Sequence, residues 1–288
     1  MKKTCIITDT NTGLTHEEAG QLGIKLISMP FTIAGKNHLE GITCSYGEFF
    51  ERLNSGAEVS TSQPSPDAVI SAWEEALEEY ESVIYIPMSS ALSGSCNTAT
   101  ALAQDYDGRV QVVDNKRVSV PQIFSVEDAI LLADYGLDAK QIKEILDKEA
   151  CTQSTYVTVN TLELLKKSGR VTKTAAAIGT VLGLKPVLQI QGEKLDSFKK
   201  ARGMDKAKSI MIDAVKDDIA TRFKGDRISL AVAYSGDKDN GLAWQQEVAY
   251  AFPGYEVVCY QLPISLCCHL GDGVLGIAVA KTMLGQKC

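Results

Sequence analysis

The chain lacks the features that mark several large classes of protein. Its formal net charge is −7, so it has no excess of basic residues with which to hold nucleic acid. Its longest late apolar run, residues 274–280, is far too short to cross a bilayer. Lys2 and Lys3 are followed after a few apolar residues by a polar segment, which is not the pattern of a secretory signal. We therefore expect a cytoplasmic protein with no nucleic-acid partner and no stable membrane insertion.

The chain has few histidines, and its cysteines lack the spacing that is typical of a metal site. It contains three histidines, and none of its eight cysteines forms a C-x-x-C pair. Several cysteines lie within apolar patterns, as expected of reduced and buried thiols. Cys267, Cys268 and His269 are adjacent, but neighbouring residues of an extended segment point to opposite faces. We expect neither disulfides nor a metal site.

Two motifs of phosphate and ester chemistry are also missing. The chain has no G-x-x-x-x-G-K-[ST] loop to hold a nucleotide and no G-x-S-x-G turn to present a nucleophilic serine. We therefore expect no bound cofactor and no catalytic residue in the chain itself.

The first half of the chain alternates between strand and helix patterns. The predicted strands cover residues 4–8, 24–33, 82–86 and 110–113, and the main predicted helices cover residues 45–53, 66–80, 121–135 and 140–149. This order is typical of a parallel sheet with helices on its faces. We expect such a domain over residues 1–158.

The second half has a different pattern. Helices are predicted at 161–167, 172–182, 205–223 and 242–252, and strands at 185–191, 194–199, 228–234 and 256–262. The two strands that flank Gly192-Glu193 read as a hairpin, and a final helix is predicted from Val274 to Met283. We therefore expect an α/β domain with a mixed, partly antiparallel sheet over residues 159–288, packed closely against the first.

Two turns rich in hydroxyl groups stand just ahead of predicted helices. Ser93 and Gly94 follow the strand at 82–86, and Thr61 and Ser62 precede a helix that Ser65 is expected to cap. The first amides of a helix have no partner within the helix and favour negative charge nearby. Each turn alone is explained by an ordinary helix cap, but together they suggest one anion site. The absence of lysine from these turns suits a carboxylate better than a triphosphate.

A third candidate turn lies near the end of the chain and contains His269, Gly271 and Gly273. A buried histidine bonded to a backbone carbonyl and a histidine that contacts a ligand fit this pattern equally well. Two specific uses of these turns remain open. Ser93 and His269 could form a hydrolase or acyltransferase site, or the turns could hold a small carboxylate or phosphate metabolite. The hydrolase has no obvious orienting acid other than Asp9 or Asp272.

Five segments together resemble the DegV family of bacterial fatty-acid-binding proteins. They are Thr61-Ser62-Gln63-Pro64-Ser65, residues 89–95, Ser168-Gly169-Arg170-Val171, Gly183-Leu184-Lys185-Pro186 and His269-x-Gly-x-Gly, in matching order across nearly the whole chain. The resemblance implies two α/β domains with a long-chain fatty acid buried between them. It also implies that the protein is not itself an enzyme but presents the acyl carboxylate to a separate, ATP-dependent fatty acid kinase subunit. That subunit would form acyl phosphate for phospholipid synthesis.

The resemblance also assigns a role to particular residues. The residues implied at the carboxylate are Thr61, Ser62, Ser93, Gly94 and His269, and Arg170 is implied near the mouth, where the phosphates of the partner's nucleotide would approach. Asp272 stands where the family often has proline, and Asp9-Thr10 stands where it often has Asp-Ser. We expect Asp272 to cap the final helix, away from the ligand. Residues 175–184 are a plausible wall for the acyl tail.

Overall fold

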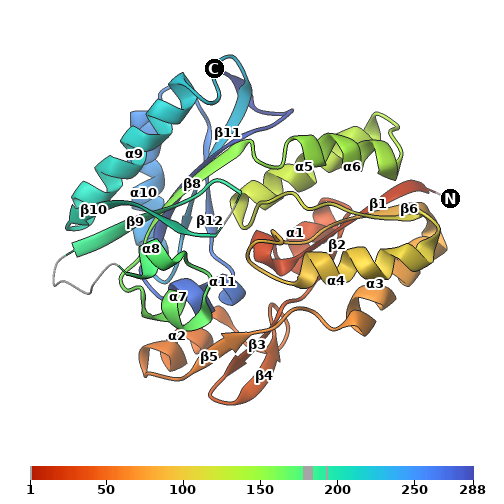
Figure 1. Ribbon diagram of the computed structural model, residues 1–288, viewed down its shortest axis with the longest axis horizontal. Helices are drawn as coiled ribbons and strands as arrows, with labels where there is room; N and C mark the ends of the chain where they lie inside the picture. Colours follow the sequence, from red (N-terminus) through yellow and green to blue (C-terminus); the bar gives the residue numbers. More distant parts are fainter. Residues whose placement is uncertain (1, 178–183, 193) are drawn as a thin grey trace.

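The computed structural model describes residues 2–177, 184–192 and 194–288. Two helix-covered sheets lie side by side, and a smaller sheet formed by β3, β4 and β5 lies at one edge (Figure 1). Most of the predicted tail wall at 175–184, part of the predicted helix at 172–182, Gly183 and Glu193 fall outside the described residues.

The first sheet is parallel throughout, which confirms the prediction. Its strand order is β2-β1-β6-β7, with bounds β1 Lys2–Asp9, β2 Lys25–Ile27, β6 Tyr80–Ile86 and β7 Val110–Val112. Successive residues of β6 face opposite layers: Val83 and Tyr85 pack with one group of helices, and Ile84 and Ile86 with another. Because both faces are covered, the strand is a continuous apolar run.

Helices on the two faces of this sheet follow the predicted boundaries closely. One face carries α3 Pro66–Glu79 and α4 Ser95–Leu102, and the other carries α1 His16–Gln21, α5 Val120–Asp134 and α6 Ala139–Lys148, with 3-10 turns at Thr10–Thr12 and Ala103–Tyr106. Ser65 accepts a hydrogen bond from the Ala68 amide, and Pro66 occupies the first turn of α3. Trp73 of the same helix is fully buried against the sheet.

A small antiparallel sheet interrupts the first half, and the sequence did not predict it. Its order is β4-β3-β5, with bounds β3 Pro30–Ile33, β4 Lys36–Leu39 and β5 Val59–Thr61, and α2 Tyr46–Asn54 lies between β4 and β5 in the chain. The single strand predicted over residues 24–33 is therefore wrong. β2 pairs with β1 only as far as Ile27 opposite Asp9, where β1 ends, so the chain beyond it pairs elsewhere. Thr61 consequently lies in this small sheet and not at an end of the parallel one.

The second sheet is mixed, as predicted. Its order is β10-β9-β8-β13-β11-β12, with bounds β8 Gln153–Thr158, β9 Leu184–Ile190, β10 Asp196–Arg202, β11 Arg227–Tyr234, β12 Val257–Gln261 and β13 Leu275–Lys281, and β14 Gln286–Lys287 pairs with β11. Only β11 and β12 run parallel among the pairs along this order. The helices α9 Met204–Ala220 and α10 Lys238–Ala251 cover one face.

The predicted final helix is wrong, because residues 275–281 form the strand β13. Leu275, Ile277 and Val279 pack with the core under α9 and α10, while the alternate residues are glycine and alanine, a period of two that suits a strand. The helix of this region comes earlier, as α11 Ile264–Leu270. The predicted capping role of Asp272 is wrong for the same reason. Its carboxylate accepts hydrogen bonds from the Gly273 amide and Asn54 Nδ2.

The chain crosses to the second sheet near the predicted domain boundary. β8 ends at Thr158 and hydrogen-bonds β9 and β13 of the second sheet. The division into residues 1–158 and 159–288 stays a prediction. α5 packs on both sheets, because Ile123 and Val126 face the first and Val120 and Phe124 face Ala231 and Ala280 of the second.

Candidate functional site

A cavity of about 240 Å³ lies between the two large sheets, next to α5 and α11. Most of its wall is apolar, and large side chains from both halves of the chain contribute to it. These include Met88, Leu92, Leu165, Leu195, Leu262 and Leu266. An apolar cavity with a few polar groups at one part of its wall is the usual form of a small-molecule site.

Small residues on the inner face of the second sheet leave the room for this cavity. Ala231 and Ala233 of β11 and Gly276 and Ala278 of β13 line it. Their neighbours in the strands pack on the opposite face, under α9 and α10. The alternation of large and small side chains that marks β13 as a strand therefore also opens the space beside it.

The polar part of the wall joins two segments that are far apart in the sequence. Thr61 Oγ1 lies 2.8 Å from His269 Nε2, and 208 residues separate the two positions. Thr61 ends β5, and His269 lies in the last turn of α11. Both side chains line the cavity. The structure therefore places these two residues in contact, as predicted.

His269 is neutral near pH 7. Burial, and secondly the positive charge of Arg170, lower the pKa of its imidazole to about 4. Its Nδ1 atom is buried and has no hydrogen-bond partner among the described residues. A bare nitrogen lone pair is less costly to leave unpaired than an N–H, so we infer that the proton resides on Nε2 and is donated to Thr61. The hydroxyl hydrogen of Thr61 is then free for another acceptor.

Ser93 and Gly94 directly precede α4, beside the Thr61 segment. Ser93 Oγ accepts a hydrogen bond from the Ser95 amide at 3.2 Å. The side chains of Gln63 and Thr98 are hydrogen-bonded, which ties the segment after β5 to α4. A Cβ atom at Gly94 would stand 3.1 Å from Gln63 Oε1, so glycine permits this close approach.

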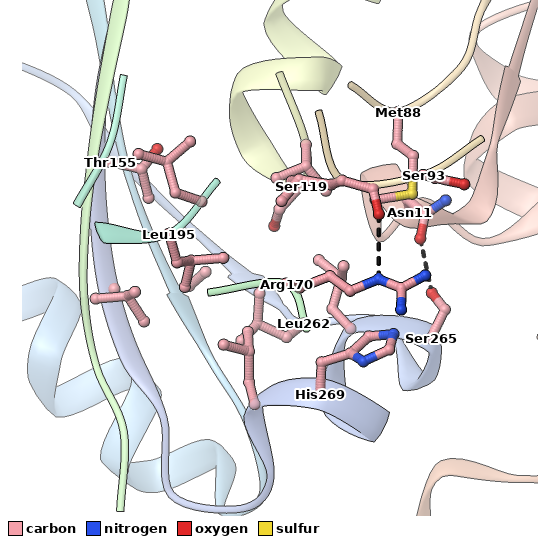
Figure 2. A pocket seen from close by; sticks show the side chains of 18 of the residues that line it. Asn11, Met88, Ser93, Ser119, Thr155, Arg170, Leu195, Leu262, Ser265 and His269 are labelled. Carbon is pink, nitrogen blue, oxygen red and sulfur yellow. Dashed lines mark hydrogen bonds between the residues drawn. The ribbon is translucent and has the colours of Figure 1, made fainter. Parts of the chain in front are cut away.

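Arg170 brings a positive charge to the same end of the cavity. It follows α7 Glu163–Ser168 and precedes the short helix α8 Lys173–Ala176. Its Nε donates to the Leu92 carbonyl at 3.3 Å, and its Nη1 donates to the Ser168 carbonyl. Figure 2 shows its guanidinium between His269 and Ser93. A carboxylate at this end would meet a cation and hydroxyl donors together.

All six residues singled out from the sequence line the cavity, namely Thr61, Ser62, Ser93, Gly94, Arg170 and His269. Ser62 and Gly94 are exposed, so they mark the side on which the polar end meets solvent. The contacts that these residues make with a ligand stay predictions.

Five further polar residues line the cavity and were not assigned to it from the sequence: Asn11, Gln63, Ser119, Thr155 and Ser265. Ser265 Oγ lies 3.0 Å from Asn11 Oδ1, a contact that Figure 2 draws. Asn11 follows a strand, which is a signal that sequence alone offers. Ser265 and Ser119 follow no such pattern, because only the packing of α11 and α5 brings them to the wall.

The arrangement gives little support to a serine hydrolase. The Nδ1 atom of His269, which an orienting acid would contact, has no hydrogen-bond partner within the described part of the chain. The two candidate acids are engaged elsewhere: Asp9 accepts from the Met88 amide and Asn11 Nδ2, and Asp272 bonds Asn54 and Gly273.

Within residues 2–177, 184–192 and 194–288, no three His, Cys, Asp or Glu side chains are grouped so as to hold a metal ion. In the same residues, no helix has the length and apolar character needed to cross a membrane.

Comparison with known proteins places the chain in a family. A family model described as "Uncharacterised protein, DegV family" matches residues 3–282. A curated DegV domain-containing protein of Deinococcus radiodurans is 28% identical over 95% of this chain and 97% of its own length. One of Listeria innocua is 29% identical over 96% of this chain and 98% of its own.

Solved structures agree in fold. The structure of a DegV family protein from Thermus thermophilus, described by its fatty acid binding, has a TM-score of 0.88 at 30% identity and covers 97% of this chain and 99% of that chain. A stearic acid-binding protein from Eubacterium ventriosum has a TM-score of 0.87 at 23% identity, with 98% of each chain covered, and shows the same fold. Matched over nearly its full length of 288 residues, this chain belongs to the DegV family.

Proposed function

We propose that this protein binds a long-chain fatty acid in the cavity between its two large sheets. The carboxylate lies at the end formed by Thr61, Ser93 and Arg170, and the tail runs along the small residues of β11 and β13. The observation that carries the proposal is the cavity itself, which is apolar along most of its wall and polar at one end. The fatty acid binding described for the Thermus thermophilus relative supports it.

The two parts of the cavity have different energetic roles. Burying about 15 methylene groups at ~0.8 kcal/mol each contributes on the order of 12 kcal/mol before the costs of association. Each hydrogen bond to a charged carboxylate contributes roughly 1.5–3 kcal/mol. The tail therefore supplies most of the affinity, and the polar end decides which end of the ligand faces outward.

We further propose that the protein presents this carboxylate to a separate kinase subunit and does not itself catalyse a reaction. In this role the partner phosphorylates the carboxylate with ATP, and the acyl phosphate feeds phospholipid synthesis. Exposed Ser62 and Gly94 next to the polar end are consistent with an approach from that side. The proposal rests on the family resemblance, and a cytoplasmic location remains a prediction with it.

The test begins with protein purified from a bacterial host. Denaturing mass spectrometry is expected to find fatty acid at about one molecule per chain, and delipidated protein is expected to take up palmitate or oleate. Finding no lipid and no uptake would refute the proposal. Native mass spectrometry separates the alternative of a small carboxylate or phosphate metabolite, because the added mass would be small.

The carrier role needs a second measurement with the partner kinase. Ser93→Ala and Thr61→Ala are expected to reduce phosphorylation of bound lipid more than they reduce lipid binding, because the hydroxyls orient the head and the tail holds the ligand. Equal losses in both would contradict this division. Covalent labelling of Ser93 by a fluorophosphonate would favour the hydrolase instead.

A further inference from the structure

One polar side chain in the cavity wall has no role in the carboxylate site. Ser119 is 9% exposed, and its hydroxyl is buried without a hydrogen-bond partner among the described residues. It lines the cavity between Val118 and Val120, which line it too. A buried hydroxyl that lacks a hydrogen-bond partner is destabilising. A polar group on a ligand in the cavity would provide the missing partner.

The backbone holds this hydroxyl toward the cavity and away from the helix that it precedes. Ser119 is the residue before α5, where a serine side chain ordinarily caps the helix. Here the Gln122 amide donates to the Ser119 carbonyl at 2.9 Å, and the side chain makes no cap. The Ser119 amide donates to the Asn11 carbonyl at 3.0 Å, which fixes this segment to the 3-10 turn that follows β1.

The conformation of this turn is unusual for a residue with a side chain. Ser119 has φ 59° and ψ −137°, in the region that favours glycine. The surrounding structure therefore maintains both a strained backbone and an unpaired hydroxyl at one point of the cavity wall.

Ser119 lies part-way along the path proposed for the tail. In Figure 2 it stands between the head-group end, marked by Arg170 and His269, and the part of the cavity marked by Thr155 and Leu195. Thr155 has a partner of its own, since its hydroxyl donates to Gln153 Oε1. The unpaired hydroxyl is thus displaced from the carboxylate end, toward the chain of the ligand.

We propose that Ser119 forms a second polar subsite, which hydrogen-bonds an oxygen substituent on the acyl chain, and that the natural ligands include mid-chain hydroxy fatty acids. This inference rests on the proposed function and specifies its substrate class. A serine hydroxyl can donate to or accept from a ligand hydroxyl, so both groups are satisfied at once. An unsubstituted chain leaves Ser119 unpaired. Away from Ser119, a ligand hydroxyl meets mostly apolar wall, or side chains such as Thr155 and Ser265 whose hydroxyls already have partners.

The experiment is a competition for the delipidated full-length protein between stearate and a set of hydroxystearates substituted at different positions. Wild type is expected to prefer one of the hydroxy isomers by about 3- to 10-fold, the range of a net hydrogen bond. Ser119→Ala is expected to abolish this preference while stearate binding is kept or improved. Ser119→Gly serves as a second variant, because glycine removes the hydroxyl and accepts the positive φ.

Ser93→Ala is the matched control, because it is expected to weaken stearate and hydroxystearates alike and to leave their ratio unchanged. The proposal is overturned if wild type prefers stearate to every isomer, as when water alone satisfies Ser119. A preference that survives in both Ser119 variants overturns it too. A protein that binds neither stearate nor any hydroxystearate refutes the proposed function itself, which distinguishes the two failures.

Discussion

Thr61 Oγ1 and His269 Nε2 are 2.8 Å apart, and they join the small antiparallel sheet of the first half to helix α11 of the second. This hydrogen bond lies at the polar end of the cavity, where both side chains line the wall. It therefore couples the geometry of the proposed carboxylate site to the packing of the two halves.

Replacing Thr61 with valine tests this coupling. Thr61→Val keeps the shape of the side chain but leaves the Nε2 atom of His269 without its partner, so the free energy of unfolding is expected to fall by about 1–3 kcal/mol. Thr61→Ser keeps the hydroxyl and is expected to lose less than half as much. Urea denaturation of the delipidated protein measures both. A larger loss for Thr61→Ser than for Thr61→Val would show that the methyl group, not the hydroxyl, stabilises this position.

The pH dependence of stability should contain a contribution from His269. Its pKa is about 4 in the folded protein, whereas an unperturbed histidine has a pKa of about 6.5. Between these values the unfolded chain binds a proton that the folded protein does not, so the free energy of unfolding is expected to fall as the pH drops from 6.5 to 4. His269→Gln should remove this part of the slope.

Arg170→Gln provides the companion measurement for His269. Because burial is the larger cause and the charge of Arg170 the smaller, this change should raise the pKa of His269 only in part. NMR titration of the imidazole reports it directly. A pKa that returns fully to 6.5 would mean that charge, not burial, dominates.

The contribution of Glu40 to stability should change with pH in the direction opposite to that of His269. It is 6% exposed, and burial raises its pKa to about 7 despite hydrogen bonds from Thr10 and Ser265. The folded protein therefore keeps a proton that the unfolded chain loses above a pH of about 4.3, and stability from this group falls as the pH rises toward 7.

The hydrogen bonds around Glu40 also require a proton on its carboxyl group. Ser265 Oγ lies 3.0 Å from Asn11 Oδ1 and 2.8 Å from Glu40 Oε2, but a hydroxyl has one hydrogen to donate. The amide group of Asn11 donates to Asp9, so its Oδ1 must face Ser265. A protonated Glu40 supplies the second hydrogen.

Glu40→Gln removes the titration and retains a donor. Its stability relative to wild type is expected to improve between pH 5 and pH 8, by up to about 3 kcal/mol. Thermal or urea unfolding at the two pH values measures the difference. Curves for variant and wild type that stay parallel across this range would contradict the assignment.

Arg117 stabilises the connection between the two halves. It is 2% exposed, and its guanidinium donates to Ser125 Oγ, the Glu149 carbonyl and Thr152 Oγ1 in the first half. It also donates to the carbonyl of Lys281, which ends β13 in the second half. Arg117→Met leaves these buried acceptors unpaired and is expected to cost about 3–5 kcal/mol of unfolding free energy. The exposed Arg109→Met is the control, expected to change stability by less than about 0.5 kcal/mol. Similar losses in both would show that Arg117 is not an anchor.

Local patterns in the sequence determined much of this fold. Strand 82–86 and the helices near 66–80, 121–135 and 140–149 were predicted because their apolar residues recur at strand or helix spacing, and Ser65 with Pro66 marks a helix start. The antiparallel pairing of β9 and β10 was predicted in the same way. The turns of the polar end were singled out by their hydroxyl groups and glycines, and the family resemblance assigned roles to their residues.

Tertiary structure alone decided the rest. Residues 275–281 alternate large and small side chains. This pattern identifies a strand only in the folded structure, where the large residues pack under α9 and α10 and the small residues line the cavity. The meeting of Thr61 with His269, the burial of Glu40 and the unpaired hydroxyl of Ser119 depend on contacts between segments far apart in the chain. Hydrophobic spacing reports which face of an element is buried, but it carries no information on which distant segment covers that face.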